Sequence, residues 1–183
     1  MAIDKIVNID QILFQKINLG MSNPFFDSLM PIITKFGSLF FWTVIAGYLI
    51  LKKKVAGATL GLGLLINSVI IFVVKNLVAR GRPETVLEGI NTLLWEGDFS
   101  FPSGHTSTAF VGAVIMGHYF PKYKPVFYSL AGLVALSRVY IGVHYPLDVL
   151  VGVAIGALVG KVVLQLPVTK YSKKYGFVND LRL

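Results

Sequence analysis

The stretch SRVYIGVHYPLD, residues 137–148, joins two apolar runs and places an arginine, a histidine and an aspartate between them. Charged groups at the edge of apolar membrane segments are costly to bury, so they usually face a cavity, a partner or a substrate. Pro146 fits the first turn of a helix, where its missing N–H would have no partner anyway, so Asp148 is expected in that turn, four residues after His144. From there its carboxylate can hold one imidazole nitrogen and leave the other free to attack. A histidine oriented in this way beside Arg138 is a candidate for covalent phosphoryl transfer.

The same residues also permit a purely structural interpretation. Asp148 can stabilise a helix N-terminus through the helix dipole, Arg138 can extend toward lipid headgroups, and His144 can be an ordinary interfacial histidine. The stretch alone leaves both interpretations open, so the other motifs must decide between them.

The composition indicates an integral membrane protein. The 183 residues are 55% hydrophobic and only 14% charged, against roughly 25% charged residues in soluble domains, and the mean hydropathy is +0.70. The length suits one all-α helical bundle, a single domain over residues 1–183. The absence of cysteine excludes disulfides, thiolate catalysis and cysteine-based metal sites. The net charge of +8 comes from basic residues between apolar segments, which favours anionic lipid surfaces over nucleic acid as a partner.

Apolar segments of helical length predict about five transmembrane helices. Several are near the short end of the roughly 17–25 residues that a crossing helix needs. The predicted spans cover residues 36–51, 55–78, 103–120, 126–141 and 146–166. Residues 3–19 carry apolar side chains at helical spacing but include Asp10 and Lys16. They predict an amphipathic helix lying in the membrane interface, within an N-terminal segment 1–23.

The distribution of lysines predicts the orientation in the membrane. If the five spans alternate, the lysine-rich segments 52–54, 122–124 and 167–183 fall on one side. The positive-inside rule places that side in the cytoplasm, so we expect a multi-pass cell-membrane protein with a cytoplasmic C-terminal tail at 167–183. Loop 79–102 and the stretch 138–146 then face outward. Basic residues collect there against the charge rule, and an anionic substrate explains them.

Small residues recur at four-residue spacing in two of the predicted spans, at Gly57 and Gly61 and at Gly152, Gly156 and Gly160. Such spacing lets helices pack closely in lipid. A flexible, glycine-rich membrane helix is the alternative, and the sequence leaves both open.

A second polar motif is KNLVARGRP, residues 75–83. Lys75 and Arg82 are seven residues apart, so they share a face if the helix continues that far, and Pro83 marks its expected end. An ammonium group and a guanidinium fork aimed at one place make a phosphate clamp, and anchoring at the membrane surface is the alternative. Arg80 lies next to this pair and is expected to support it without contacting the substrate.

A third motif, residues 101–105 (FPSGH), stands where a predicted span begins. Ser103 can cap that helix, and the free N–H groups of its first turn then point at an anion. Gly104 allows close approach of the backbone to a ligand, and His105 is placed to donate a proton to a departing oxygen. A serine cap followed by an interfacial histidine is the alternative. All three motifs lie on the same predicted membrane side, and this convergence favours the functional interpretation.

Together the three motifs resemble the signature of the type 2 phosphatidic acid phosphatase superfamily. The resemblance rests on the pattern Lys75-x6-Arg82-Pro83, Pro102-Ser103-Gly104-His105 and Ser137-Arg138-x5-His144-x3-Asp148. The superfamily includes membrane lipid phosphatases and, more distantly, glucose-6-phosphatase and the vanadium haloperoxidases. The signature is long and gapped, and is therefore specific. It covers residues 75–148, and the five predicted spans resemble the membrane branch.

The resemblance implies a role for each signature residue. His144 would be the nucleophile that forms a phosphohistidine, and Asp148 would orient it. His105 would protonate the leaving oxygen and later activate water. The phosphate oxygens would be held, and the charge of transfer stabilised, by Lys75, Arg82, Arg138, Ser103 and the Gly104 N–H.

The family needs no metal ion or other cofactor, so none is expected here. The acidic residues of the outward-facing loop show no ligand spacing and predict a solvated loop rather than a site. They are Glu84, Glu88, Glu96 and Asp98.

The predicted activity is hydrolysis of a lipid phosphate or diphosphate at the outer leaflet. An outward site on a short chain makes undecaprenyl diphosphate the first expected substrate. Phosphatidylglycerophosphate, phosphatidate and diacylglycerol diphosphate are alternatives, and broad specificity is expected. Two other classes remain: a transporter or flippase that binds the phosphate without cleaving it, and vanadate-dependent oxidation on the same residues, whose branch is typically larger and soluble.

Overall fold

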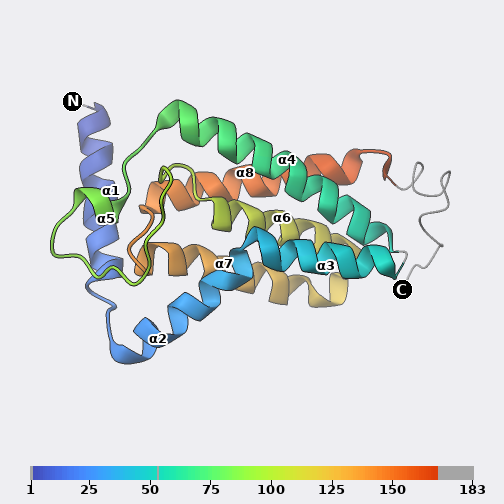
Figure 1. Ribbon diagram of the computed structural model, residues 1–183, viewed down its shortest axis with the longest axis horizontal. Coiled ribbons are helices and arrows are strands. Elements are labelled where there is room, and N and C mark those ends of the chain that lie inside the picture. The colour runs from blue at the N-terminus through green and yellow to red at the C-terminus, as the bar shows by residue number, and fades with distance from the viewer. Residues whose placement is uncertain (1, 53, 169–183) are drawn as a thin grey trace.

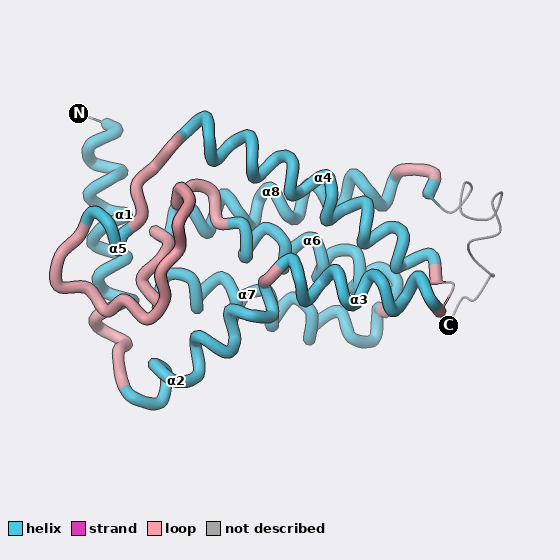
Figure 2. The backbone as a smooth tube through the Cα atoms, in the orientation of Figure 1, coloured by secondary structure: helices cyan, strands magenta, loops and turns pink. Residues whose placement is uncertain are grey.

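The computed structural model describes residues 2–52 and 54–168, and all regular structure in these residues is helical (Figures 1 and 2). The elements are α1 (Ala2–Asn18), α2 (Pro24–Ile33), the 3-10 helix η1 (Thr34–Gly37), α3 (Leu39–Leu51), α4 (Val55–Val78), α5 (Pro83–Val86), α6 (Gly104–Tyr119), the 3-10 helix η2 (Pro121–Tyr123), α7 (Lys124–Tyr140) and α8 (Pro146–Gln165). The predicted all-α class is confirmed. The last four predicted spans correspond to α4, α6, α7 and α8, with ends that differ by two residues or fewer.

Helix α6 lies at the centre of the bundle. It packs against α3, α4, α7 and α8, and most of its side chains are buried. Its sequence, GHTSTAFVGAVIMGHY, is rich in small residues that let neighbouring helices approach closely. One apolar cluster joins four of these helices through Trp42 of α3, Leu60 of α4, Ile115 of α6 and Val163 of α8.

The packing of α8 on α6 depends on the glycines of α8. A Cβ at Gly156 would lie 2.2 Å from the carbonyl oxygen of Ser107, and one at Gly152 would lie 2.7 Å from the carbonyl oxygen of Ser103. The small-residue spacing of α8 is therefore a packing surface, which is one of the two interpretations of the sequence. In α4 the two glycines differ. A Cβ at Gly57 would lie 2.8 Å from the carbonyl oxygen of Ala46 in α3, whereas one at Gly61 would meet nothing within 4 Å.

Two segments are long and apolar enough to cross a membrane, Val55–Val86, which contains α4, and Pro146–Gln165, which is α8. A third candidate is the pair Pro24–Gly37 and Leu39–Leu51, which is bent by 47°. Helices α6 and α7 have 16 and 17 residues, which is just below the 18 residues required of a candidate span. The described residues thus hold two or three spans by this criterion, and the count of five stays a prediction.

The two ends of the bundle carry different groups. The turns α3–α4 and α6–α7 and the C-terminal end of α8 lie at one end, so the lysine-rich turns share that end as predicted (Figure 1). Loop 87–103 and the turn between α7 and α8 lie at the other end, where the three sequence motifs gather (Figure 2). Residues 169–183 of the predicted tail lie outside the described residues.

Helix α1 runs across the motif-bearing end of the bundle instead of along it (Figure 1). Its buried side chains in the described range 5–18 are Asp10, Phe14 and Asn18. These residues are four apart and therefore share one face of the helix. The Phe14 ring lies 5.6 Å from the ring of Tyr145 between α7 and α8, so this face docks α1 on the turn that also carries His144.

The other faces of α1 expose apolar side chains, among them Ile6, Ile9 and Leu13. Asp10 contributes to the polarity that predicts an interfacial helix, yet it is buried with 5% of its surface exposed. Asp10 therefore faces the protein, while the outward faces of α1 carry apolar side chains together with Lys5, Asn8, Gln15 and Lys16. Its position in the membrane interface stays a prediction.

Replacing Gly156 by alanine is expected to destabilise the protein, because the new Cβ would collide with the Ser107 carbonyl oxygen. Overpacking costs about 1–3 kcal/mol, which exceeds the roughly 1 kcal/mol by which alanine is favoured over glycine in a helix. Gly61→Ala is the matched control, since its methyl group enters open space, and it is expected to be neutral or stabilising. Thermal unfolding of the purified protein in detergent measures both. Equal melting temperatures for the two variants would contradict the packing role of Gly156.

Candidate active site

The three sequence motifs meet where α4 ends and α6 and α8 begin. The backbone N–H of Ser103 donates to the carbonyl oxygen of Asp148 at 3.0 Å. Arg82 Nη1 lies 3.3 Å from His144 Nε2, which joins the first motif to the last. The end of the bundle thus gathers the predicted site residues Lys75, Arg82, Ser103, Gly104, His105, Arg138, His144 and Asp148.

His144 lies in the turn between α7 and α8 and is 1% exposed. Its Nδ1 is 3.4 Å from Oδ2 of Asp148, while Nε2 faces the guanidinium of Arg82. Because a guanidinium N–H can only donate, this contact places the lone pair on Nε2 and the proton on Nδ1. Within the described residues Nδ1 forms no hydrogen bond, so this is a charge contact with the carboxylate, and such contacts commonly tighten when the substrate binds. One ring nitrogen faces the carboxylate and the other faces the cations, as the spacing of four residues predicted.

The surroundings keep the imidazole of His144 uncharged. Burial lowers the pKa of His144 well below its ordinary value, and the positive charges of Arg138 and Arg82 lower the pKa further. A neutral imidazole with its lone pair on Nε2 is the form that can attack phosphorus.

The turn that presents His144 depends on its neighbours in the sequence. Gly142 has a φ of +92°, in the left-handed region that favours glycine, and a Cβ there would lie 2.7 Å from a carbonyl oxygen of the loop beside it. Pro146 occupies the first turn of α8, as predicted. The N–H of Tyr145 donates to Oδ2 of Asp148 at 2.9 Å. Together these contacts hold the backbone on both sides of the histidine.

Lys75 and Arg82 converge on one carboxylate without sharing a helical face. Helix α4 ends at Val78, and the next residue turns the chain with a φ of 49°. The expectation that the helix continues to Pro83 is therefore wrong. Lys75 Nζ nevertheless lies 2.6 Å from Oδ2 of Asp98, and Arg82 pairs with the same carboxylate. The two basic groups meet through the loop that follows the helix.

The two arginines nearest His144 are almost fully buried. Arg138 has no exposed surface and Arg82 is 2% exposed. Arg138 Nη1 donates to Oγ1 of Thr34 at 2.8 Å, and Arg82 Nη1 donates to the carbonyl oxygen of Val143 at 2.8 Å. These contacts fix both guanidinium groups beside the histidine.

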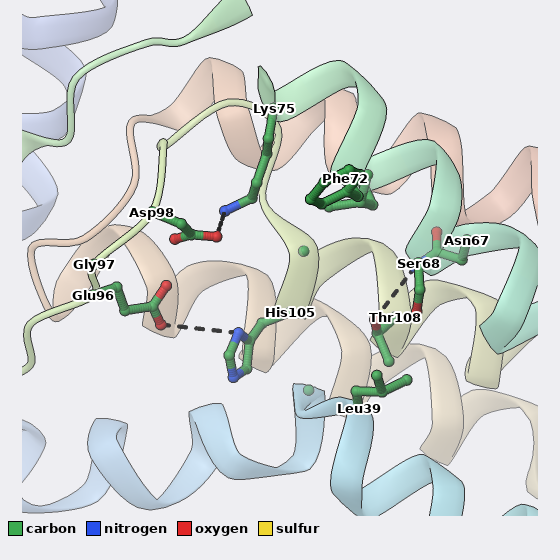
Figure 3. A pocket seen from close by; sticks show the side chains of 13 residues that line it. Leu39, Asn67, Ser68, Phe72, Lys75, Glu96, Gly97, Asp98, His105 and Thr108 are labelled. Atoms are coloured by element: carbon green, nitrogen blue, oxygen red, sulfur yellow. Dashed lines mark hydrogen bonds and ion pairs between the residues drawn. The ribbon is translucent and has the colours of Figure 1, made fainter. Parts of the chain in front are cut away.

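Glu96 and Asp98 both pair with the cluster of cations. The prediction of a solvated loop is wrong for Glu96, whose side chain is 24% exposed, whereas the side chain of Asp98 is 59% exposed. Glu96 Oε2 lies 2.8 Å from Arg82 Nη2, and its other oxygen pairs with Arg138. That other oxygen is also 4.0 Å from Nδ1 of His105 (Figure 3). A carboxylate of the protein thus occupies the space between three residues predicted to handle phosphate.

Glu96 is charged at ordinary pH. Burial alone would raise its pKa, but the positive charges of Arg138 and Arg82 outweigh burial and lower the pKa to about 2. Since the pKa in the folded protein lies below the ordinary value of 4.5, these ion pairs stabilise the fold above about pH 4.5 and are lost as the pH falls toward 2. A bound anion can therefore replace Glu96 by competition, whereas a change of pH in the physiological range does not release it.

Helix α6 begins at the site, and two pockets open at this end of the bundle. Ser103 Oγ accepts a hydrogen bond from the N–H of Thr106 at 3.4 Å, so the predicted cap is present. Gly104 and His105 line a pocket of about 440 Å³ (Figure 3). A second pocket, of about 560 Å³, is lined by residues of α4 and of the segment after it. Residues 96–98 line both pockets, so movement of this segment would open a larger space beside the cations.

The sequence patterns did not indicate a functional role for three acidic residues at this end of the bundle: Glu96, Asp98 and Asp10. The signal that identifies them is charge balance, because buried cations need counterions from groups within reach. The remaining acidic residues of the loop differ from each other. Glu84 is buried, and its carboxylate oxygens have no hydrogen-bond partner among the described residues, so the prediction of a solvated loop is wrong for Glu84. Glu88 is exposed as predicted.

The fold and the site define a class of protein. A neutral histidine held between a carboxylate and cationic side chains, at the end of an apolar helical bundle, is typical of a membrane enzyme that hydrolyses phosphate esters. The sequence profile of the PAP2 superfamily matches residues 56–172. The chain belongs to the PAP2 superfamily, and the resemblance of its three motifs is confirmed.

A curated relative and two solved structures support this assignment. The undecaprenyl-diphosphatase of Sulfolobus acidocaldarius is 33% identical over 154 residues, which cover 81% of this chain and 74% of that protein. Other curated relatives are matched over about half of their own length. The crystal structure of Aquifex aeolicus LpxE superposes with a TM-score of 0.80 and 30% identity, covering 85% of this chain and 94% of that one. The crystal structure of a transmembrane PAP2-type phosphatidylglycerolphosphate phosphatase from Bacillus subtilis superposes with a TM-score of 0.73 and 28% identity. The match covers 93% of this chain and 87% of that one.

Replacing Glu96 by glutamine is expected to strengthen the binding of phosphate-like anions, because an incoming anion no longer has to displace a carboxylate from Arg82 and Arg138. A hydrogen bond to a charged group contributes about 1.5–3 kcal/mol. The inhibition constant of inorganic orthovanadate is therefore expected to fall at least about tenfold.

Glu88→Gln is the matched control, because Glu88 is exposed on the same loop, and it is expected to leave the constant unchanged. Inhibition of phosphate release at a fixed lipid concentration measures both variants. A constant for Glu96→Gln that equals or exceeds that of the wild type would show that Glu96 supports the anion site and does not compete for it.

Proposed function

We propose that this chain is a metal-independent phosphatase that hydrolyses lipid phosphates or diphosphates through a phosphohistidine and releases inorganic phosphate. One observation carries the proposal. His144 holds one ring nitrogen against Asp148 and presents the other to Arg82, inside a cluster of cations. Membership of the PAP2 superfamily and the phosphatase names of its relatives support the same class of reaction.

The first step forms the covalent intermediate. His144 Nε2 attacks phosphorus, and the bond between phosphorus and the leaving oxygen of the lipid breaks. A protonated His105 gives its proton to that oxygen. Asp148 stabilises the positive charge that the ring of His144 gains as the N–P bond forms.

The second step returns the enzyme to its starting state. His105, now neutral, takes a proton from water while the water oxygen attacks phosphorus. The N–P bond breaks, inorganic phosphate leaves, and His105 is protonated again. One histidine therefore serves as nucleophile and the other as acid and then base.

The phosphate oxygens take over contacts that Glu96 and Asp98 make in the free protein. Such an exchange replaces one anion by another, so the buried cations are never left unpaired. The phosphate is held by Lys75, Arg82, Arg138, the Ser103 side chain and the Gly104 N–H at the start of α6. Their positive charge offsets the negative charge that spreads over the phosphoryl oxygens during transfer.

The apolar side of the pocket favours a lipid over a water-soluble ester. Leu39 at the start of α3 and Phe72 near the end of α4 line the pocket that holds His105 (Figure 3). Phe72 is 69% exposed, on a helix long and apolar enough to cross a membrane. A lipid chain can therefore remain in the bilayer beside these residues while its phosphate enters the site.

Undecaprenyl diphosphate is the first substrate we propose. The Sulfolobus relative bears the name undecaprenyl-diphosphatase and shares most of the length of this chain. A phosphatase of broad specificity for phosphatidylglycerophosphate or phosphatidate is the alternative, and the Bacillus structure bears the former activity in its title. The same site serves either substrate, because each presents a phosphate group at the end of an apolar chain.

We further propose the arrangement in the membrane. The single domain, 1–183, crosses the membrane five times, with α1 in the interface within segment 1–23. The lysine-rich turns and the tail at 167–183 lie in the cytoplasm, and loop 79–102 with the active site faces outward. The positive-inside rule supports this orientation, and the common end of the lysine-rich turns agrees with it.

Phosphate release by the purified protein in EDTA tests the reaction. We expect wild-type protein to hydrolyse at least one of undecaprenyl diphosphate, phosphatidylglycerophosphate and phosphatidate, and His144→Ala to release no phosphate while remaining folded. With substrate labelled at the phosphorus that is transferred, wild-type protein quenched during turnover is expected to carry a label that acid destroys and alkali preserves, because an N–P bond is labile in acid, and His144→Ala is expected to carry none. Thermal unfolding and gel filtration in detergent verify that each variant is folded.

Near-normal turnover by folded His144→Ala would refute the histidine mechanism. Stoichiometric lipid binding without phosphate release, in folded wild-type protein, would instead indicate a binding or transport protein. Halide oxidation with added vanadate would indicate the oxidative class. The ranking of the three lipids decides between undecaprenyl diphosphate and the glycerophospholipids.

A further inference from the structure

The N-terminal helix reaches the catalytic histidine through a chain of charged groups. Arg80 Nη1 lies 2.6 Å from Oδ1 of Asp148, and its Nη2 lies 2.7 Å from Oδ2 of Asp10 on α1. The side chain of Asp148 has no exposed surface and that of Asp10 has 6%. The guanidinium of Arg80 also lies 3.9 Å from the centre of the Tyr145 ring, which favours a cation. One arginine therefore bridges two buried carboxylates from opposite ends of the sequence.

Asp10 holds the start of α8 with its second oxygen. Its Oδ1 accepts a hydrogen bond from the backbone N–H of Leu147 at 2.8 Å. The first N–H groups of a helix have no partner within the helix, and Asp10 supplies one from another element. The two oxygens of Asp10 thus bind two groups next to Asp148. Oδ1 binds the N–H of Leu147, which precedes Asp148 in the chain, and Oδ2 binds Arg80, which pairs with Asp148. This arrangement explains why an aspartate is buried on a helix that exposes apolar residues.

We propose that Asp10 and Arg80 are positioning residues of the reaction. Arg80 holds Oδ1 of Asp148, so that Oδ2 stays directed at Nδ1 of His144, and Asp10 holds both Arg80 and the first turn of α8. The negative charge of Asp10 also offsets the positive charge of Arg80, which leaves Asp148 able to stabilise the charged ring of His144. This inference rests on the proposed role of His144 as nucleophile.

A purely structural role for these contacts, the docking of α1 on the bundle, gives a different kinetic result. Within the described residues, Asp10 pairs with Arg80 and Leu147 and with none of the residues proposed to hold phosphate. A change at Asp10 should therefore reduce kcat and leave KM near its wild-type value. Loss of docking alone would reduce the amount of folded protein and leave the kcat of the folded fraction intact.

Asp10→Asn separates the two contacts of Asp10, because the amide oxygen of asparagine can still accept from Leu147 while its NH2 group cannot accept from Arg80. Misplacement of a catalytic group by a remote change can reduce a rate by about 100-fold, and we expect kcat to fall between about 10-fold and 100-fold. KM for the lipid is expected to stay within about threefold, since the phosphate contacts are untouched. Arg80→Lys keeps one positive charge but cannot bridge two carboxylates, so it is expected to reduce kcat in the same way.

The double variant Asp10→Asn, Arg80→Lys tests whether the two residues act in one chain. Residues that act through one another are not additive, so the double variant is expected to lose little more kcat than the worse single variant. Asp27→Asn on α2 is the matched control. Asp27 accepts hydrogen bonds from Tyr140 at 2.6 Å and from Asn91 at 3.0 Å, and its variant is expected to keep the wild-type kcat.

The experiment measures kcat and KM for undecaprenyl diphosphate in detergent, with folding verified by thermal unfolding. Folded Asp10→Asn with wild-type kcat overturns the inference, as does a loss of kcat that multiplies fully in the double variant. If Asp10→Asn does not fold, Arg80→Lys decides in its place, and a wild-type kcat in that variant overturns the inference. Failure of the proposed function looks different, because the wild type would then release no phosphate, or His144→Ala would release it normally.

Discussion

Buried positive charge at one end of an apolar bundle is the constraint on which the structure depends. Arg138 and Arg82 have almost no exposed surface, and removing such groups from water costs several kcal/mol each unless they are paired. Glu96 and Asp98 provide the pairing in the free protein. Their ion pairs also fasten loop 87–103 onto the ends of α4 and α7, so the charges that prepare the site for an anion help to shape the loop that covers it.

Two charge networks meet at His144. On the side of Nε2, Arg82 belongs to the network that faces the pockets and exchanges a carboxylate for phosphate in the proposed reaction. On the side of Nδ1, Asp148 belongs to a network with Arg80 and Asp10 that holds the start of α8. In the proposed reaction the first network rearranges in each cycle, while the second stays in place. Because the two sets of cations have separate counterions, the first network can move without disturbing the second.

The positions of the helices and most of the site were predictable because local rules govern them. Runs of apolar residues bounded by lysine, proline or serine define α4, α6, α7 and α8 to within two residues, since a helix in lipid must satisfy its own backbone. The contact between His144 and Asp148 follows from a spacing of four residues across a helix start. The cap by Ser103 follows from local sequence in the same way, whereas the sequence left open whether the glycines of α8 form a packing surface, and the structure shows that they do.

The sequence by itself determined the helical membrane bundle, the family and the signature residues that converge at one end, because each of these is written in short-range patterns. Only the tertiary structure decided which anions neutralise the cations. Nothing in the spacing of Glu96 and Asp98 marks them as partners of Arg82, and Asp10 lies 70 residues from Arg80. Ion pairs have no sequence period: they depend on which side chains the packed helices leave within reach, and on the cost of leaving a charge unpaired where water is excluded.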